Sequence, residues 1–326
     1  SNTEEGSMKV DVLCIGPITG ETIYTTKTLD PNILPKRIRA MMQSHVSTRA
    51  QDVVFGCGGA GYIAALGLTR LGIKTALAAR VGQDSIGCEA VRKLESEGVR
   101  TSLVIQTPQA ATTMMTLLRS PQDDSFEISY VAPGGYDKKC ISNFSKITAD
   151  WVYVSGPFTD LGELKNILSW CKKSGAQSMV RLTQSDIVQA RRAIKILSKA
   201  TICVFELEDA ELLTHQLDIE SALLALRESG LKTVILQDGT AALGAIHDGF
   251  VYQAKGGRKP TVINTTGVPE VVGPAMLAHL TRNSDFGAAL DFGLTVARSV
   301  GGYIGSESGL LNSLAHRTGK VYKKFI

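Results

Sequence analysis

The chain has 326 residues, of which 44% are hydrophobic, so it is long enough and apolar enough to bury a core. The formal net charge is only +4, and the basic residues are scattered apart from short clusters, which argues against nucleic acid as a ligand. The six cysteines form no CxxC pair and have no histidine at metal-ligand spacing, so neither a zinc site nor a disulfide framework is predicted, and a reducing, cytoplasmic location is favoured.

Residues 1–7 are polar and acidic, unlike a signal sequence, and we expect them to be disordered or left over from an expression vector. No apolar run approaches the length of a membrane span, so no membrane association is predicted. Residues 8–326 contain no long linker, low-complexity tract or short-period repeat, and are expected to form a single α/β domain.

The first part of this domain alternates between predicted strands and helices. The apolar run at 10–16 ends in glycine, as a buried strand would, and residues 51–72 pass through a glycine turn into a helical pattern. A strand follows at 74–82, and residues 84–99 have the spacing of an amphipathic helix. Such alternation predicts a mainly parallel sheet with helices on both faces.

In residues 101–132 the alternation stops, because apolar runs are separated there by turn-like segments and not by helices. This pattern predicts a hairpin-like β insert. Together with the hydrophobic residues at about 22–50, the insert is expected to form a small sheet packed over the main one.

After the insert, the alternation of strands and helical stretches resumes at 150–158 and continues to a strand at 233–239. Residues 241–252 have the pattern of a hairpin, with Asp248 and Gly249 at its turn. A β-like run then leads into the turn NTTGVPE at 264–270, after which an apolar stretch predicts a late helix. A small-residue turn between a strand and a helix is a common place for backbone N–H groups to hold an anion.

The order and spacing of several segments resemble the ribokinase-like (PfkB) carbohydrate kinase family over nearly the whole chain. The segments are GGAGYIAALGLTRLG (58–72), VGQDSIG (81–87), DWVYVSGPF (150–158) and NTTG (264–267). The resemblance implies a three-layer α/β/α domain with a mainly parallel sheet. It also implies a small β-sheet lid formed by about 22–50 and 101–132.

The resemblance further implies transfer of the ATP γ-phosphoryl group, with Mg²⁺, to a hydroxyl of a small sugar-like or nucleoside-like substrate. The family turn usually reads Asp-Thr-Thr-Gly-Ala-Gly-Asp, and its last Asp accepts the hydroxyl proton, a role that falls here to Glu270. Gly267 and neighbouring amides would stabilise the transferring phosphate. The resemblance assigns anion or nucleotide binding to Asn264, Thr265, Thr266, Gly267, Val268 and Gly239.

For the substrate, the resemblance points to Glu21, where the family has an Asp, to the glycine pair Gly58 and Gly59, and to Ile63, where the family has an Asn. Glu206 and Asp209 stand where the family has an Asn-x-x-Glu motif that helps to organise magnesium. The same acidic residues are also typical of a solvated helix start, where carboxylates favour the dipole.

The anion turn departs from the family pattern in a way that bears on catalysis. Pro269 deletes one amide, and the loss of one such donor typically lowers a rate by roughly 10²–10³. A proline is also a good residue for the first turn of a helix, which is the simpler interpretation. Pro274 is expected to kink or delay the helix.

Three interpretations therefore stay open. The first is a sugar or nucleoside kinase homologue whose activity is weakened or altered, and the second is a catalytically silent protein that binds a ligand or partner on the same fold. The third, less favoured, is an NADP-binding oxidoreductase, because residues 56–61 satisfy GxGxxG but Ala79 and Arg80 stand where an acidic residue should follow. The exposed edges of a lid sheet also suggest a homodimer.

Overall fold

A computed structural model describes residues 8–25, 49–120, 125–133, 141, 143–158, 160–183, 186, 190–257, 261–282, 285–315 and 319–326. The predictions for residues 1–7 and for most of the first lid segment, 26–48, lie outside these residues. Within them, every helix is too short or too polar to cross a membrane.

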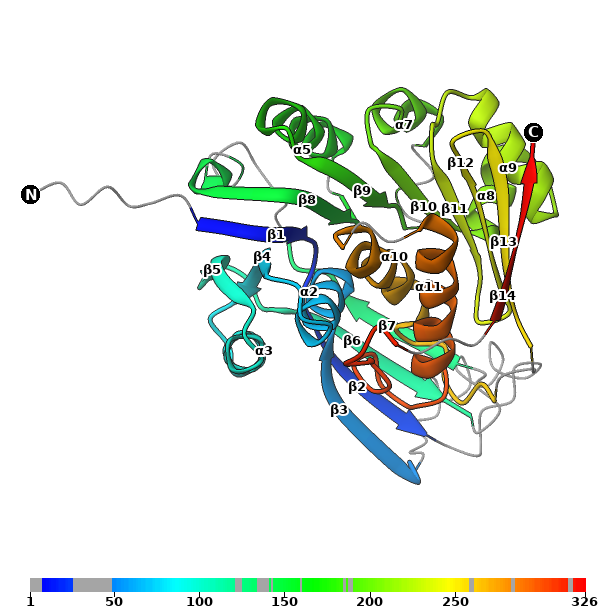
Figure 1. The fold of residues 1–326 in the computed structure, drawn as a ribbon. Helices are drawn as coiled ribbons and strands as arrows, with labels where there is room; N and C mark the ends of the chain where they lie inside the picture. The colour runs from blue at the N-terminus through cyan, green and yellow to red at the C-terminus, as the bar shows by residue number, and fades with distance from the viewer. Residues whose placement is uncertain are drawn as a thin grey trace, which may run out of the picture.

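One large sheet runs through the molecule in the strand order β14-β13-β12-β11-β10-β9-β8-β1-β4-β5 (Figure 1). Neighbours from β11 to β5 are parallel, and neighbours from β11 to β14 are antiparallel. The strands are β1 (Met8–Ile15), β4 (Thr75–Gly82), β5 (Arg100–Thr107), β8 (Ile147–Ser155), β9 (Gln177–Arg181), β10 (Ile202–Glu206), β11 (Val234–Asp238), β12 (Ala242–His247), β13 (Phe250–Gly256) and β14 (Gly319–Phe325).

Both faces of this sheet are buried under helices (Figure 1). In β1, Val12 and Cys14 enter one hydrophobic core, while Leu13 and Ile15 enter the other. The first core includes α2 (Ala60–Arg70), α3 (Ser85–Ser96), α10 (Val268–Leu280) and α11 (Phe286–Val300). The second face is covered by η1 (Asn143–Lys146), α5 (Leu161–Ser174), α7 (Ala190–Leu197), α8 (Leu207–Thr214) and α9 (Ile219–Glu228). The three-layer prediction is confirmed.

A second, small sheet has the order β3-β2-β6-β7. Its strands are β2 (Thr19–Thr25), β3 (Asp52–Gly58), β6 (Thr113–Arg119) and β7 (Ser125–Tyr130). The predicted lid segment 101–132 is therefore too long, because its first run is β5, a parallel neighbour of β4 in the large sheet. The hairpin proper is β6 and β7, and β3 extends the small sheet beyond the predicted limit at residue 50.

The outer strands of the small sheet carry exposed apolar side chains. Phe55 on β3 is 72% exposed, and Ile128 on β7 is 58% exposed. Unpaired strand edges with such side chains invite pairing with another chain. The homodimer stays a prediction, and these two strands are where its contacts are expected.

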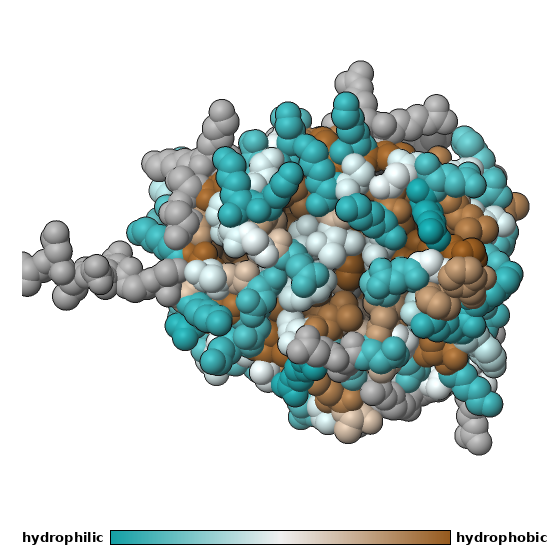
Figure 2. All heavy atoms as spheres, turned by 45° about the horizontal axis from the view of Figure 1, so that its top comes forward, coloured by the Kyte–Doolittle hydropathy of each residue, from teal (hydrophilic) through white to brown (hydrophobic). Residues whose placement is uncertain are grey.

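The turn between β12 and β13 confirms the predicted hairpin. Asp248 and Gly249 have φ values of 46° and 80°, as two-residue turns with the twist of a hairpin require. Elsewhere the surface mixes hydrophilic and hydrophobic residues over the face shown in Figure 2, which is normal because polar groups cannot cover a whole protein surface.

Candidate functional site

The turn before α10 is shaped by Gly267. This residue caps the helix with a φ of 84°, which side chains other than glycine adopt only with strain. A Cβ atom added to it would also lie 2.8 Å from Ser306 Cα. The turn therefore requires glycine both for its conformation and for the close approach of the loop that carries Ser306.

Asn264 holds the first part of the turn from inside. Its side chain is fully buried, and its Oδ1 accepts hydrogen bonds from the Thr266 N–H at 3.2 Å and the Thr266 hydroxyl at 2.9 Å. The backbone N–H groups of Ile263 and Asn264 both donate to Gly301 O, at the end of α11. Asn264 thus organises the turn, and the Thr266 N–H is used as a donor within the turn.

Most of the other amides in the turn also have partners within the chain. The Val268 N–H donates to Thr265 O at 3.1 Å, and the Glu270 N–H donates to Gly267 O at 3.2 Å. Pro269, at the second position of the helix, has no N–H. The helix begins at Val268, so the prolines do not delay it. Across the described part of the chain, we find no acceptor for the Gly267 N–H.

Gln237, at the end of β11, connects the turn to Gly239. Its Nε2 donates to Val268 O at 3.0 Å and to Gly239 O at 3.2 Å, and its side chain is buried. The predicted nucleotide-side residues Gly239 and Val268 are therefore neighbours in space. Gln237 was not among the predicted site residues, although it lies near the end of a predicted strand, two residues before the predicted site residue Gly239.

Arg181 brings charge to the same place. It ends β9, its side chain is only 5% exposed, and its Nη1 lies 3.8 Å from Oε1 of Glu270. Its Nη2 lies 4.0 Å from Oε2 of Glu206. Burial alone would lower the pKa of Arg181, but Glu270, Tyr153 and Glu206 raise it overall, so the guanidinium stays charged. The predicted base is thus paired with a buried arginine.

Glu206 and Asp209 lie on the other side of this arginine. Burial raises the pKa of Glu206 to about 7 and that of Asp209 to about 6, while Arg181 acts in the opposite direction on both. Among the described residues, no group of three or more His, Cys, Asp or Glu side chains is placed to hold a metal ion. Arg181 already opposes the charge of Glu206, and the indirect role of Glu206 and Asp209 in placing Mg²⁺ stays a prediction.

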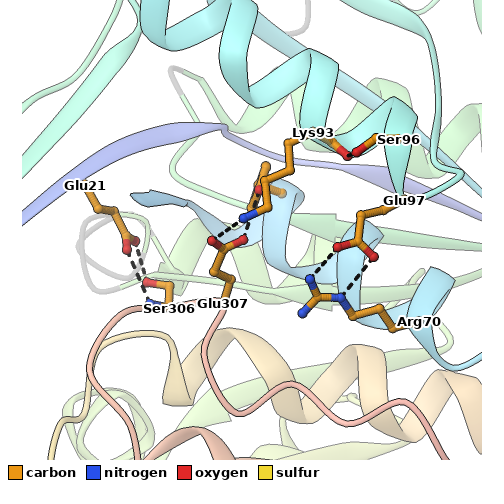
Figure 3. Close-up of polar contacts among 8 residues, drawn as sticks. Glu21, Arg70, Lys93, Ser96, Glu97, Ser306 and Glu307 are labelled. Atoms are coloured by element: carbon orange, nitrogen blue, oxygen red, sulfur yellow. Dashed lines mark hydrogen bonds and ion pairs between the residues drawn. The ribbon is translucent and has the colours of Figure 1, made fainter. Parts of the chain in front are cut away.

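Glu21 lies on β2 and is buried, with Ser306 donating to it from both its hydroxyl and its N–H (Figure 3). A Cβ on Gly58 would collide with its carboxylate, so the glycine leaves the room that Glu21 fills. The pKa of Glu21 is raised to about 7, mainly by burial and also by the charges of Glu270 and Glu307, although the hydrogen bonds from Ser306 lower it. Glu21, Gly58 and the Gly267 turn thus meet around Ser306.

A pocket of about 470 Å³ opens between the small sheet and α3, with Glu21 in its wall. Its lining residues are Gly20, Glu21, Thr22, Phe55, Gly56, Cys57, Ser85, Ile86, Glu89, Lys93, Met114 and Glu307. Lys93 Nζ lies 2.5 Å from Oε1 of Glu307 (Figure 3). The other carboxylate oxygen of Glu307 accepts a hydrogen bond from the Tyr62 hydroxyl at 3.2 Å. The pocket mixes apolar walls with paired charges, as small-molecule sites do.

Three predicted substrate residues, Gly58, Gly59 and Ile63, are not among the residues that line this pocket. Gly59 caps α2 with a φ of 87°, and Ile63 is 1% exposed within the core. The N–H groups of Gly61 and Tyr62 donate to Pro17 O, and β3 pairs antiparallel with β2. The dinucleotide interpretation is therefore not supported, because its glycine fingerprint needs a parallel strand and free amides.

The layers, the small second sheet and the glycine turn that opens α10 together define a ribokinase-like α/β fold. The chain belongs to the pfkB family of carbohydrate kinases, whose model matches residues 17–311.

Solved structures agree with this assignment of the fold. The chain is 16% identical to adenosine kinase from Sinorhizobium meliloti, with a TM-score of 0.75 over 92% of this chain and 97% of that one. It is 16% identical to the Methanocaldococcus jannaschii nucleoside kinase, with a TM-score of 0.71 over 93% and 95%. For ribokinase from Thermotoga maritima the values are 14%, 0.72, 91% and 95%. No curated protein matches the chain.

Proposed function

We propose that the protein is a kinase that transfers the γ-phosphoryl group of ATP to a hydroxyl of a small sugar-like or nucleoside-like substrate. Family membership supports the reaction class, and the nucleoside kinase and ribokinase among the structural neighbours support both acceptor classes. The acceptor would enter the pocket beside Glu21, between the small sheet and α3.

The observation that carries this proposal is the meeting of Glu270, Gly267 and Glu21. Glu270 lies in the first turn of α10, where the helix N-terminus favours negative charge, and its side chain is 24% exposed, so a substrate can reach it. Its charge acts on the Glu21 carboxylate, which links the turn electrostatically to the pocket. Glu270 would take the hydroxyl proton, and the Gly267 N–H would donate to the phosphoryl oxygens.

ATP would supply the phosphoryl group when bound, and the turn and Gly239 would hold its phosphate end. Phosphoryl transfer depends mainly on position and on charge stabilisation. Asn264 and Gln237 serve that need by fixing the turn and Gly239 relative to each other. Glu206 and Asp209 are not assigned a metal, because Arg181 lies beside them.

A second candidate is a catalytically silent protein that binds a small ligand or a partner. The observation in its favour is that Pro269 lacks an N–H while the Val268 and Glu270 amides bond within the chain. In this case Glu270 would be an ion-pair partner of Arg181 and would not move a proton.

A screen of ADP formation over sugars and nucleosides separates the two candidates. The kinase should release ADP with at least one acceptor and be stabilised by ATP in thermal melts. A thermal shift from a sugar or nucleoside with no ADP release would assign the silent role.

The variant Glu270→Gln tests the base directly. It keeps the size of the side chain but cannot accept a proton, so turnover should fall by about 10²–10⁴ while ATP binding is kept. Glu228→Gln, at the exposed end of α9, is the matched control and should leave turnover unchanged. Equal turnover of wild type and Glu270→Gln would remove Glu270 from the mechanism.

A further inference from the structure

The charges around Arg181 indicate which cation balances the carboxylates at this end of the sheet. Three carboxylates, those of Glu206, Asp209 and Glu270, act electrostatically on its guanidinium. Two of them lie within 4.0 Å of it, and the arginine is almost completely buried. A buried arginine is rarely unpaired, and here its charge is opposed by more than one acid.

The position of Arg181 in the fold is that of a ligand-binding residue. It ends β9, Glu206 ends the neighbouring parallel strand β10, and Glu270 opens α10. In open parallel sheets, ligands bind outside the carboxyl ends of the strands. The guanidinium therefore lies at the edge of the sheet where folds of this type bind their ligands.

The contacts of the guanidinium are charge contacts more than hydrogen bonds. Its Nη1 is buried and makes no hydrogen bond, and the carboxylate Oδ2 of Asp209 is buried without a partner too. A cluster evolved only to bury an ion pair would be expected to satisfy such atoms. The unused donor and the unused acceptor leave the cluster able to respond to a ligand.

We propose that Arg181 is the resident cation of the Glu206, Asp209 and Glu270 carboxylates and takes the place of a protein-bound divalent metal ion. A divalent ion is usually held by one or two carboxylates together with phosphate oxygens. Here the guanidinium already opposes the charge of these acids and would repel a divalent ion placed beside them. The positive charge that faces an incoming phosphate is then fixed to the chain. This proposal rests on the proposed function only for its phosphate ligand, since the exclusion of a metal ion concerns the free protein.

Binding of Mn²⁺ to the full chain without nucleotide tests the proposal, with free Mn²⁺ measured by electron paramagnetic resonance. Wild type should bind no Mn²⁺ at this cluster over the concentrations used, whereas Arg181→Leu should bind it with a Kd at least about tenfold below the highest of these concentrations, because the like charge is gone. Adding Glu206→Gln to Arg181→Leu should abolish the new binding. Arg70→Leu is the matched control, because Arg70 pairs with one carboxylate, Glu97, and its loss should create no site.

Two results would overturn the proposal. One is Mn²⁺ binding by wild type that Glu206→Gln weakens, and the other is a folded Arg181→Leu protein that binds no more Mn²⁺ than wild type. If Arg181→Leu does not fold, Arg181→Met replaces it, since a longer apolar side chain fills more of the volume. Absence of ADP formation would refute the kinase and leave the Mn²⁺ result unaffected, so the two failures are distinguishable.

Discussion

Two helices of this protein begin in the same way, but their first amides have different partners. Gly59 before α2 and Gly267 before α10 both have φ values near 85°, at 87° and 84°, and neither helix has a side-chain cap. At α2, the first amides donate to Pro17 O, so the chain uses them to join the small sheet to the helix. At α10, Glu270 in the first turn lies 3.8 Å from Arg181, and its charge raises the pKa of Glu21 in the pocket wall. The backbone geometry of a turn therefore does not by itself define a binding site. The partners of its amides must be known as well.

The two turns are connected through Glu21 and Ser306. Glu21 fills the space beside Gly58, just before the α2 turn, and it accepts hydrogen bonds from Ser306. The same Ser306 packs against Gly267, where an added Cβ would meet its Cα at 2.8 Å. A disturbance at one turn should therefore be felt at the other.

The largest predicted effect is a loss of stability when a Cβ atom is added at Gly59 or at Gly267. Gly59→Ala and Gly267→Ala each combine left-handed strain with a backbone collision, with Pro17 O at 2.7 Å and Ser306 Cα at 2.8 Å. The free energy of unfolding should fall by about 3 kcal/mol or more for each. Chemical denaturation measures it.

Gly175→Ala is the matched control, because its φ is 77° but no atom lies within 4 Å of the added Cβ. It should lower stability by about 1 kcal/mol, from strain alone. If all three variants lose the same amount, close approach is not what fixes these turns. Of the two turn variants, only Gly267→Ala should also weaken ATP binding, and equal weakening by Gly59→Ala would break the distinction between the turns.

The Glu21 carboxylate, which connects the two turns, should make the free energy of unfolding depend on pH. The pKa of Glu21 is about 7 in the folded protein against an ordinary 4.5, so the folded state holds an extra proton between these pH values. Stability is then highest below pH 4.5 and falls as the pH rises to about 7. Glu21→Gln should remove the part of this fall that comes from Glu21, about 3 kcal/mol relative to wild type, and leave the part that comes from Glu206 and Asp209.

Glu97 provides a control of opposite sign. Its hydrogen bond with Arg70 lowers its pKa, so its contribution is present at neutral pH and is lost as the pH falls. Glu97→Gln should therefore change the acid side of the curve and leave the fall towards pH 7 in place. Identical curves for wild type and Glu21→Gln would show that Glu21 is solvated.

The fold could be predicted from the sequence because strands such as β1 and β8 contain apolar runs, VLCI and WVYV, and segments with helical spacing follow many of the strands. The strand at 100–107 was wrongly placed in the lid, because it is half-buried and lacks a helix before the next strand. Whether a strand joins one sheet or the other depends on its partner, and a partner distant in sequence leaves no local signal.

The candidate site could be predicted only in part. The NTTG turn and Glu270 were found because a small-residue turn before a helix has a physical meaning. Arg181 was visible only as a departure from the family pattern, and Ser306 left no signal, because its role arises from a close approach across 285 positions. The Gly56–Gly61 string shows the converse: its local pattern matches the less favoured dinucleotide interpretation, but the Gly61 and Tyr62 amides donate to Pro17 O.

The smallest predicted effect is a change in turnover. It tests whether the missing N–H of Pro269 limits the rate. Pro269→Ala restores an N–H at the second helix position and keeps a helix-forming residue, so the cradle gains one hydrogen-bond donor. We expect turnover, with the acceptor found in the ADP screen, to rise by about tenfold, because an added donor acts on the transferring phosphate. Pro274→Ala, in the middle of the same helix, adds an N–H away from the turn and should leave the rate unchanged. A Pro269→Ala protein with the wild-type rate would mean that the missing amide is not the limit, and the α10 turn would then resemble the α2 turn in serving the fold alone.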